Sequence, residues 1–307
     1  MASLAQGSLS TVLPEVDYMA EGYKHFKAGN FSRAITYFEA ELQIRPENVS
    51  AWTVLGKCHA ENENDRHAIS CLEHAVEHDP YSLDALLALG VSYVNELNTG
   101  RALRTLRAWV EHNPVYAGMD TDDLQSSETK PAFNGPSVHT RMLREVKELL
   151  HQALHHSLTD NPEASSSVHE ALGVCYNVSH EYDTAVGHFR KALEVRPADY
   201  ALWNKLGATM ANGNRSDEAL EAYMKALELK PKYARAWLNM AIAHNNLKQY
   251  DEAARCYLQT LSLNPEASHC WSYLRIALTY MERWDLVSAA SDQNLDEFHK
   301  YFDFVDP

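Results

Sequence analysis

Apolar residues along most of the chain recur with the spacing of amphipathic helices, close to 3.6 residues per turn. In the stretch from Arg141 to Asp160, for example, the leucines and valine fall on one face of a single helix. Elsewhere the helical stretches come in pairs, because turn-forming dipeptides such as Gly29-Asn30 and Gly213-Asn214 separate them. The pattern therefore predicts an all-α protein built from helical hairpins.

Prolines, glycines, alanines and tryptophans then repeat every 34 residues. The recurring positions are Pro46, Pro80 and Pro114; Pro197, Pro231 and Pro265; Gly56 and Gly90; Gly173 and Gly207; Ala34, Ala68 and Ala102; Ala185, Ala219 and Ala253; and Trp203, Trp237 and Trp271. This is the period and residue pattern of the tetratricopeptide repeat. Small residues let the two helices of a hairpin approach closely, and proline marks a helix boundary. We predict a tetratricopeptide repeat superhelix of about seven helical hairpins, one of them degenerate, with C-terminal helices.

The repeats fall into two clusters. Complete repeats are predicted at 15–48, 49–82, 83–116, 166–199, 200–233 and 234–267. The chain thus divides into a lead-in, 1–14; a first cluster, 15–116; a loop and degenerate repeat or spacer helix, 117–165; a second cluster, 166–267; and C-terminal helices and a tail, 268–307. Inside the spacer, Asp120 to Pro136 predicts an exposed loop. In the tail, 268–286 predicts one helix and 292–304 a short capping helix.

Composition excludes several classes of function. The net charge of −15 argues against nucleic-acid binding, and no apolar run approaches the roughly 18 residues of a membrane span. The five cysteines are odd in number and no pair is spaced C-x-x-C, so buried free thiols are expected instead of disulfides or a structural zinc site. The histidine pairs His74/His78 and His151/His155 lack a third ligand. Because no catalytic or nucleotide-binding motif occurs, we expect neither an enzyme nor a cofactor.

Asparagines gather on the face where a ligand would bind. In stacked hairpins, the first helix of each pair lines the concave side. The asparagines predicted on that side are Asn95, Asn204, Asn212, Asn239, Asn245 and Asn246. Asparagine is a poor helix former, whereas its carboxamide can both donate to and accept from an extended peptide backbone. Arg235 adds a cationic fork suited to a carboxylate. Together they predict capture of a chain end with its terminal carboxylate.

Three segments carry a family resemblance. Val91 to Glu96, Leu202 to Asn214 and Arg235 to Asn246 resemble the cargo-binding half of the peroxisomal targeting signal type 1 receptor. The resemblance implies binding of C-terminal tripeptides of the Ser-Lys-Leu type on peroxisomal or glycosomal matrix proteins. It also implies a cytoplasmic protein that cycles to the membrane of that organelle.

The same resemblance assigns roles to single residues. The tripeptide backbone and carboxylate would be held by Asn95, Asn204, Asn212, Arg235, Asn239 and Asn246. Glu96 would lie near the penultimate lysine of the signal. Val91, Lys205 and Ala208 would surround the pocket for the terminal leucine. Val94 departs from relatives that can carry threonine there.

Two further expectations concern partners. The family's long N-terminal half and its Trp-x-x-x-Phe or Trp-x-x-x-Tyr motifs are not found here, so the chain should bind cargo but not reach the peroxisomal docking proteins alone. The alternative is a tetratricopeptide co-chaperone or scaffold that binds other protein C-termini. A co-chaperone clamp wants several cations, and the concave face offers mainly Lys205 and Arg235.

Overall fold

The computed structural model describes residues 16–117, 138–157 and 161–304, and within these ranges the chain forms helices and no strand. Consecutive helices pair as hairpins: α1 (Tyr18–Lys27) with α2 (Phe31–Ile44), α3 (Val49–Glu61) with α4 (Asp65–His78), α5 (Leu83–Asn95) with α6 (Thr99–Glu111), α9 (Pro162–Val178) with α10 (Tyr182–Val195), α11 (Tyr200–Asn212) with α12 (Ser216–Leu229), α13 (Ala234–Asn246) with α14 (Tyr250–Leu263), and α15 (Ser268–Tyr280) with α16 (Trp284–Ser291). The helix α8 (Val138–Ser157) lies between the third and fourth of these hairpins in the sequence, and two 3-10 helices are η1 (Pro114–Tyr116) and η2 (Leu295–Lys300). The predicted all-α tetratricopeptide architecture is confirmed. The lead-in 1–14 and the loop Asp120 to Pro136 lie outside the described residues.

The C-terminal prediction was wrong in detail. The helix expected over 268–286 ends at Tyr280, and a second helix begins at Trp284. Glu282 between them has a φ of 58°, which lies in the left-handed region and ends a right-handed helix. The expected capping helix over 292–304 is only the 3-10 helix η2. The turn was missed because no glycine, asparagine or proline marks it.

Helix α9 likewise begins earlier than the repeat predicted at 166–199. Its first residue is Pro162, and the side chain of Asn161 caps it by accepting from the backbone N–H of Ala164 at 3.1 Å. Proline suits this position because the first N–H of a helix has no partner inside the helix. The extra turn lengthens the helix that follows α8.

Turns between paired helices share one backbone conformation. Each contains a residue with positive φ, and these residues again lie 34 apart within each cluster: Gly29, Glu63 and Leu97, then His180, Asn214, Lys248 and Glu282. Among these residues, Gly29, Asn214 and His180 are of types that are enriched in this region. At the other positions, the helices on either side impose the turn.

The repeating small residues perform the packing task expected of them. A Cβ added to Gly56 would lie 2.6 Å from Cγ of Leu72, and one added to Gly207 would lie 2.6 Å from Cε1 of Tyr223. Both contacts join the two helices of one hairpin. Successive repeats are linked by the tryptophans, since Nε1 of Trp203 donates to the carbonyl oxygen of Pro197 at 2.8 Å.

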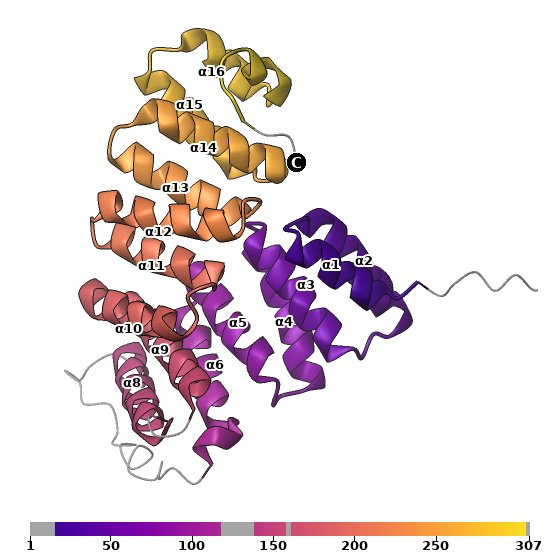
Figure 1. The fold of residues 1–307 in the computed structure, drawn as a ribbon, viewed down its shortest axis with the longest axis vertical. Coiled ribbons are helices and arrows are strands. Elements are labelled where there is room, and N and C mark those ends of the chain that lie inside the picture. The colour runs from indigo at the N-terminus through magenta and orange to yellow at the C-terminus, as the bar shows by residue number, and fades with distance from the viewer. Residues whose placement is uncertain (1–15, 118–137, 158–160, 305–307) are drawn as a thin grey trace, which may run out of the picture.

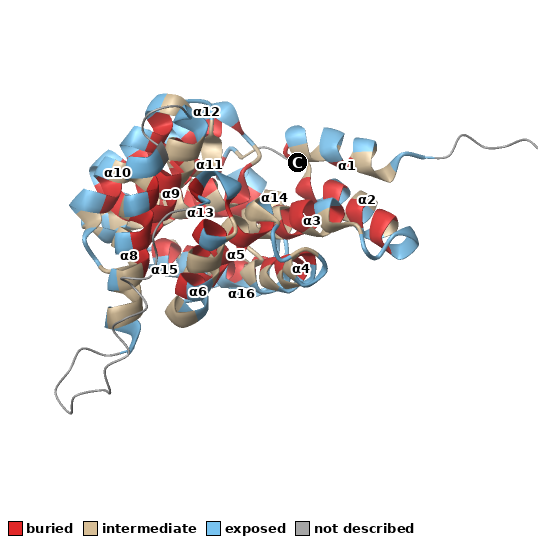
Figure 2. Ribbon diagram, turned by 90° about the horizontal axis from the view of Figure 1, so that it is seen from below, coloured by how far each residue is buried: buried red, intermediate tan, exposed pale blue. Residues whose placement is uncertain are grey.

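Helices α9–α16 stack as a column, and α1–α6 stand beside it (Figure 1). One hydrophobic core runs from Leu86 in α5 through Val146 in α8 to Phe302. Smaller clusters fill the first two hairpins and the junction between the second and third. Helix α8 packs on α6 and α9 and so links the two clusters. Figure 2 shows the buried residues following the packed sides of the helices.

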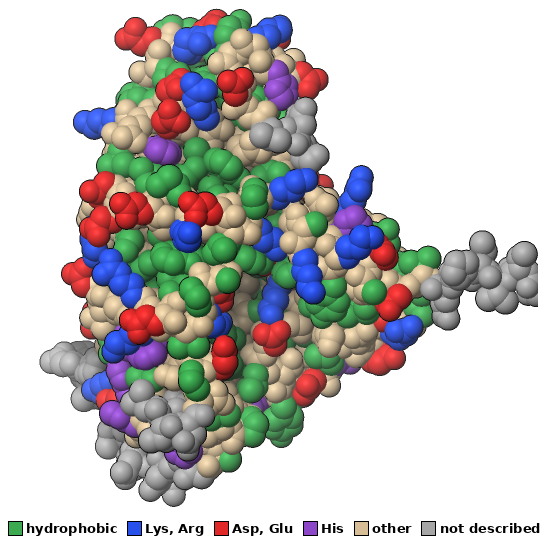
Figure 3. Space-filling model, viewed as in Figure 1, with side chains coloured by type: hydrophobic (Ala, Val, Ile, Leu, Met, Phe, Trp, Pro, Cys, Tyr) green, Lys and Arg blue, Asp and Glu red, His purple; other side chains and the backbone are tan. Residues whose placement is uncertain are grey.

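The first two hairpins also touch the second cluster directly. The ammonium group of Lys230 lies 4.4 Å from the ring centroid of Phe26 and 4.4 Å from that of Tyr200, and it donates to the carbonyl oxygen of Phe26 at 2.8 Å. Lys232 donates to Oδ1 of Asn30 at 3.0 Å. These contacts join the first hairpin to the turn between α12 and α13. Figure 3 shows a recess between the two groups of helices.

Candidate peptide-binding site

Two predicted asparagines contact each other in the middle of neighbouring first helices. Nδ2 of Asn239 in α13 donates to Oδ1 of Asn204 in α11 at 3.0 Å. Asn204 is buried, with 4% of its surface exposed, and its own Nδ2 lies 3.4 Å from the hydroxyl of Tyr233. Asn239 is half-buried, so its carboxamide faces partly outward with an acceptor oxygen that this pair does not use.

Asn95 and Arg235 meet at one carboxylate. Asn95 closes the last turn of α5 and donates from Nδ2 to Oδ1 of Asp65 at 3.1 Å. Arg235, in the first turn of α13, donates from Nη2 to Oδ2 of the same group at 2.7 Å. Sequence analysis predicted both residues as peptide-binding, and in the structure they contact this one acid of the chain from different clusters.

The guanidinium of Arg235 is held from several sides. Its Nε donates to the carbonyl oxygen of Ala60 at 2.7 Å and lies 3.1 Å from Oε1 of Glu63. Only 14% of the Arg235 side chain and 11% of the Asp65 and Glu63 side chains are exposed. Burial lowers the pKa of Arg235, but the charges of Glu63 and Asp65 outweigh it and raise this pKa overall. For Glu63, burial is the largest effect and raises its pKa despite the nearby arginine.

Asn212 and Asn246 lie at the C-terminal ends of their helices and are exposed. Nδ2 of Asn212 approaches Oδ1 of Asn177 at 3.3 Å, and Nδ2 of Asn246 approaches the hydroxyl of Ser216 at 3.4 Å. Because both contacts are long for hydrogen bonds, these carboxamides remain open to better partners.

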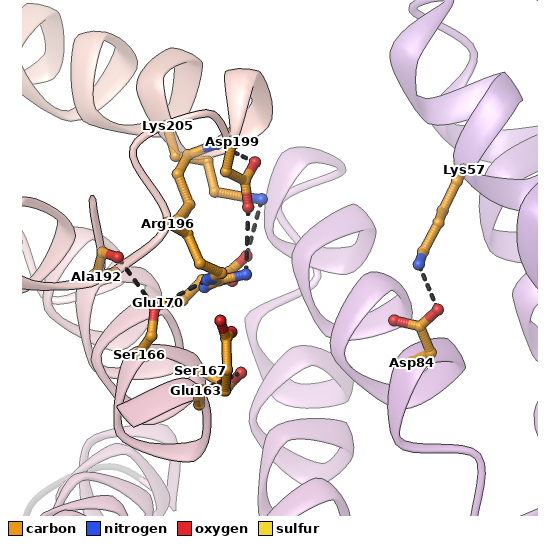
Figure 4. Close-up of polar contacts among 11 residues, drawn as sticks. Lys57, Asp84, Glu163, Ser166, Ser167, Glu170, Ala192, Arg196, Asp199 and Lys205 are labelled. Carbon is orange, nitrogen blue, oxygen red and sulfur yellow. Dashed lines mark hydrogen bonds and ion pairs between the residues drawn. The ribbon is translucent and has the colours of Figure 1, made fainter. Parts of the chain in front are cut away.

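Lys205 belongs to a charge cluster on the inner side of α9–α11 (Figure 4). The carboxylate of Glu170 accepts from Lys205 at 3.0 Å and from Arg196 at 2.7 Å. Burial raises the pKa of Glu170, but the two cations outweigh it and hold the pKa at about 2. On the facing helices, Lys57 pairs with Asp84 at 2.6 Å, so both sides of the recess carry neutralised pairs.

Val91, Ala208 and Glu96, the remaining predicted residues, lie at half-buried or exposed positions on α5 and α11 or just after α5. Val91 and Ala208 are half-buried on the first helices, and Val91 packs against the main core. Glu96 is exposed and lies 3.5 Å from Nε of Arg66. Glu96 also borders a shallow depression at the α5–α6 turn, whose other side is formed by His139 at the start of α8.

Sequence reasoning missed the acids and amides that hold the predicted residues. Glu63 and Asp65 sit at the α3–α4 turn, where acidic residues are too common to stand out. Asn177 could have been found, because it occupies the same repeat position as Asn245. Oδ1 of Asn245 is buried and accepts no hydrogen bond. Asp65 and Asn177 contact residues of other repeats, Arg235 and Asn212. The pattern of a single helix therefore does not reveal these contacts.

The cysteines and the possible metal ligands form no further site among the described residues. All five cysteines are buried and free, as expected, and burial raises the pKa of Cys175 to about 12. Within the described ranges, no group of three or more histidines, cysteines or acids is placed to hold a metal ion. None of the helices in those ranges is long and apolar enough to cross a membrane.

The chain is similar to known proteins over much of its length. Tetratricopeptide repeat families match residues 19–69, 211–248 and 234–266. The peroxisomal targeting signal 1 receptor of Dictyostelium discoideum is 41% identical over 200 residues, covering 65% of this chain and 30% of that protein. Over these residues, the chain is similar to this receptor.

Two further relatives have similar names and similar coverage. A PEX5-related protein of Rattus norvegicus is 36% identical over 64% of this chain and 32% of its own length, and the peroxisomal targeting signal receptor of Yarrowia lipolytica is 34% identical over 61% and 30%. The chain spans about a third of the length of each of these curated relatives. A solved structure of MamA protein is a looser match, with 22% identity and a TM-score of 0.35 over 71% of this chain and 92% of that one.

Proposed function

We propose that the chain is the cargo-binding part of a peroxisomal targeting signal receptor and captures C-terminal tripeptides of the Ser-Lys-Leu type. The names of the relatives support a receptor for peroxisomal targeting signals. The observation that carries the finer proposal is the Asp65 carboxylate, which accepts from Asn95 and Arg235 together. Donors that already converge on one carboxylate are arranged to bind another.

Each part of a tripeptide then has a partner. The terminal carboxylate lies against Arg235 and Asn95, which supply charge-assisted hydrogen bonds. The carboxamides of Asn204 and Asn239, with the end-of-helix Asn212 and Asn246, pair with the peptide backbone. This recognition reads the backbone and leaves side-chain selection to the groove walls.

Side-chain selection follows from the same surroundings. Val91, Ala208 and the aliphatic stem of Lys205 line the place for the terminal leucine. The ammonium of Lys205 stays bound to Glu170, so it leaves its methylene groups for apolar contact. Glu96, near the acidic turn of Glu63 and Asp65, favours lysine at the penultimate position of the peptide.

The charge pairing separates this proposal from an acidic-tail clamp. Lys57, Lys205 and Arg235 are each paired with an acid of the chain itself. A clamp for acidic tails needs several unpaired cations on one face. The proposed protein instead works as a receptor that cycles between cytoplasm and peroxisome or glycosome, with the docking proteins as further partners.

Fluorescence anisotropy tests the proposal directly. A labelled peptide ending in Ser-Lys-Leu is titrated with the protein, beside the same peptide with an amidated C-terminus. We expect saturable binding of the acid and at least about tenfold weaker binding of the amide, because a buried charge partner is lost. Equal affinity for both peptides would show that no carboxylate is recognised.

A further inference from the structure

Asp65 occupies the donors that the peptide carboxylate would need. Its two oxygens accept from Asn95 at 3.1 Å and from Arg235 at 2.7 Å. Its side chain is only 11% exposed, so water screens the contact with Arg235 weakly. The chain thus supplies its own carboxylate at the place where the proposed ligand carries one.

We propose that Asp65 is an internal competitor that sets the affinity of this site for C-terminal carboxylates. The proposal rests on the proposed function, because it concerns the same donors. When the peptide binds, its carboxylate takes over hydrogen bonds that Asp65 gives up. The measured affinity is therefore the difference between the two carboxylates, not the full strength of the Arg235 contact.

The surrounding contacts make this exchange feasible without freeing Arg235. Its Nε keeps the carbonyl oxygen of Ala60 at 2.7 Å and the carboxylate of Glu63 at 3.1 Å. The guanidinium therefore stays in place when Asp65 lets go. Asn95 is exposed, so the site can be approached from its side.

A competitor and a purely structural partner predict opposite results. If Asp65 only positions Arg235, neutralising it would misplace the guanidinium and weaken peptide binding. If Asp65 competes, Asp65→Asn removes the rival negative charge and strengthens binding of the acid peptide. The change is isosteric, which keeps the turn and the hydrogen bond to Asn95 sterically possible.

The test compares Asp65→Asn with Asp84→Asn in the anisotropy assay above. Asp84 is an acid on α5 that is 75% exposed and pairs with Lys57 at 2.6 Å, so its variant reports the general effect of removing one negative charge. We expect Asp65→Asn to bind the acid peptide at least about fivefold more tightly than wild type. We expect a smaller gain for Asp84→Asn, and no gain of Asp65→Asn on the amidated peptide.

The outcomes separate this inference from the proposed function. If wild type binds the acid peptide and Asp65→Asn gains no more than Asp84→Asn, the competitor is overturned and the receptor function stands. If wild type and every variant fail to bind the acid peptide, both fall together. Should Asp65→Asn not fold, Asp65→Ser removes the same carboxylate and leaves the contacts of Arg235 with Glu63 and Ala60 intact, and it must bind the acid peptide more tightly than wild type, or the inference is wrong.

Discussion

Arg235 and Asp65 lie 170 residues apart in the sequence and meet at 2.7 Å. The contact joins α13 of the second cluster to the first turn of α4 in the first cluster. It sits beside the contacts of Lys230 with Phe26 and of Lys232 with Asn30, which join the same two parts. The residue proposed to bind cargo is therefore also one that holds the two clusters in their facing arrangement.

Replacing this arginine should destabilise the folded chain. Arg235→Met removes the cation but keeps an aliphatic side chain, and it leaves the buried acids Glu63 and Asp65 without their partner. Breaking such a pair typically costs about 3–5 kcal/mol. Denaturant unfolding followed by circular dichroism should show a clearly lower midpoint than wild type.

The matched control is Arg255→Met. Arg255 pairs with Asp251 one turn away at 2.8 Å, but its side chain is 38% exposed. Exposed pairs contribute about 0–1 kcal/mol, so the midpoint should hardly move. Equal losses for the two variants would mean that the contact between clusters adds nothing to stability.

The paired asparagines give a prediction about binding. Asn239→Ala removes the donor to Asn204 and the carboxamide proposed to meet the peptide backbone. We expect about tenfold weaker binding of the Ser-Lys-Leu peptide, since leaving a buried polar group unpaired typically costs about 1–3 kcal/mol. Anisotropy titration measures it.

Asn294→Ala serves as the control for this variant. Asn294 is exposed before η2, and its side chain makes no capping hydrogen bond. Its replacement should leave peptide affinity unchanged. Unchanged affinity of Asn239→Ala as well would contradict the placement of the peptide on α11 and α13.

The sequence was sufficient for the repeat architecture because each repeat packs on its neighbours. Gly56 and Gly207 mark close helix approaches, and the tryptophans and prolines mark the joints between repeats. The turn at Glu282 was missed because neighbouring helices, not its residue type, determine its conformation. The partners of Arg235 were missed for a similar reason. Contacts between the clusters depend on how the whole superhelix curves, which brings the two clusters face to face. The spacing of residues along the chain does not predict that curvature.

Two glycines should respond in opposite ways to the same substitution. Gly187 lies within α10, and a Cβ there would meet nothing within 4 Å. Alanine is the better helix former, so Gly187→Ala should stabilise the chain by about 0.5–1 kcal/mol. In Gly207→Ala the new Cβ would press on the ring of Tyr223 at 2.6 Å, and overpacking typically costs about 1–3 kcal/mol. Melting curves of the two variants and wild type, recorded together, measure both effects. A rise in melting temperature for Gly207→Ala would contradict the close approach of α11 to Tyr223 in α12.

A histidine cluster between α8, α9 and α10 should make stability depend on pH. Nδ1 of His169 lies 2.9 Å from Nδ1 of His188, and Nε2 of His151 lies 2.9 Å from the hydroxyl of Tyr176. Burial lowers the pKa of His169 and of His188 to about 4, and the neighbouring histidines and Lys191 add to the shift.

The sign of the effect follows from comparing folded and unfolded chains. Unfolded histidine has a pKa of about 6.5, so below that pH the unfolded chain binds more protons than the folded one. The stability contributed by neutral His169 and His188 is therefore complete above about pH 6.5 and is lost as pH falls toward 4. Melting temperature should decline across this window.

The variant His188→Gln isolates the cluster's share of that decline. Glutamine keeps a polar group beside His169 but cannot take up a proton, so the melting temperature should fall less steeply between pH 6.5 and 5 than in wild type. His78→Gln, at an exposed histidine in the last turn of α4, should retain the wild-type slope. Identical slopes in all three proteins would show that the buried histidines do not govern acid sensitivity. A smaller loss of melting temperature with falling pH in His188→Gln alone would show that the histidine cluster of α8, α9 and α10 contributes to the acid sensitivity of the fold.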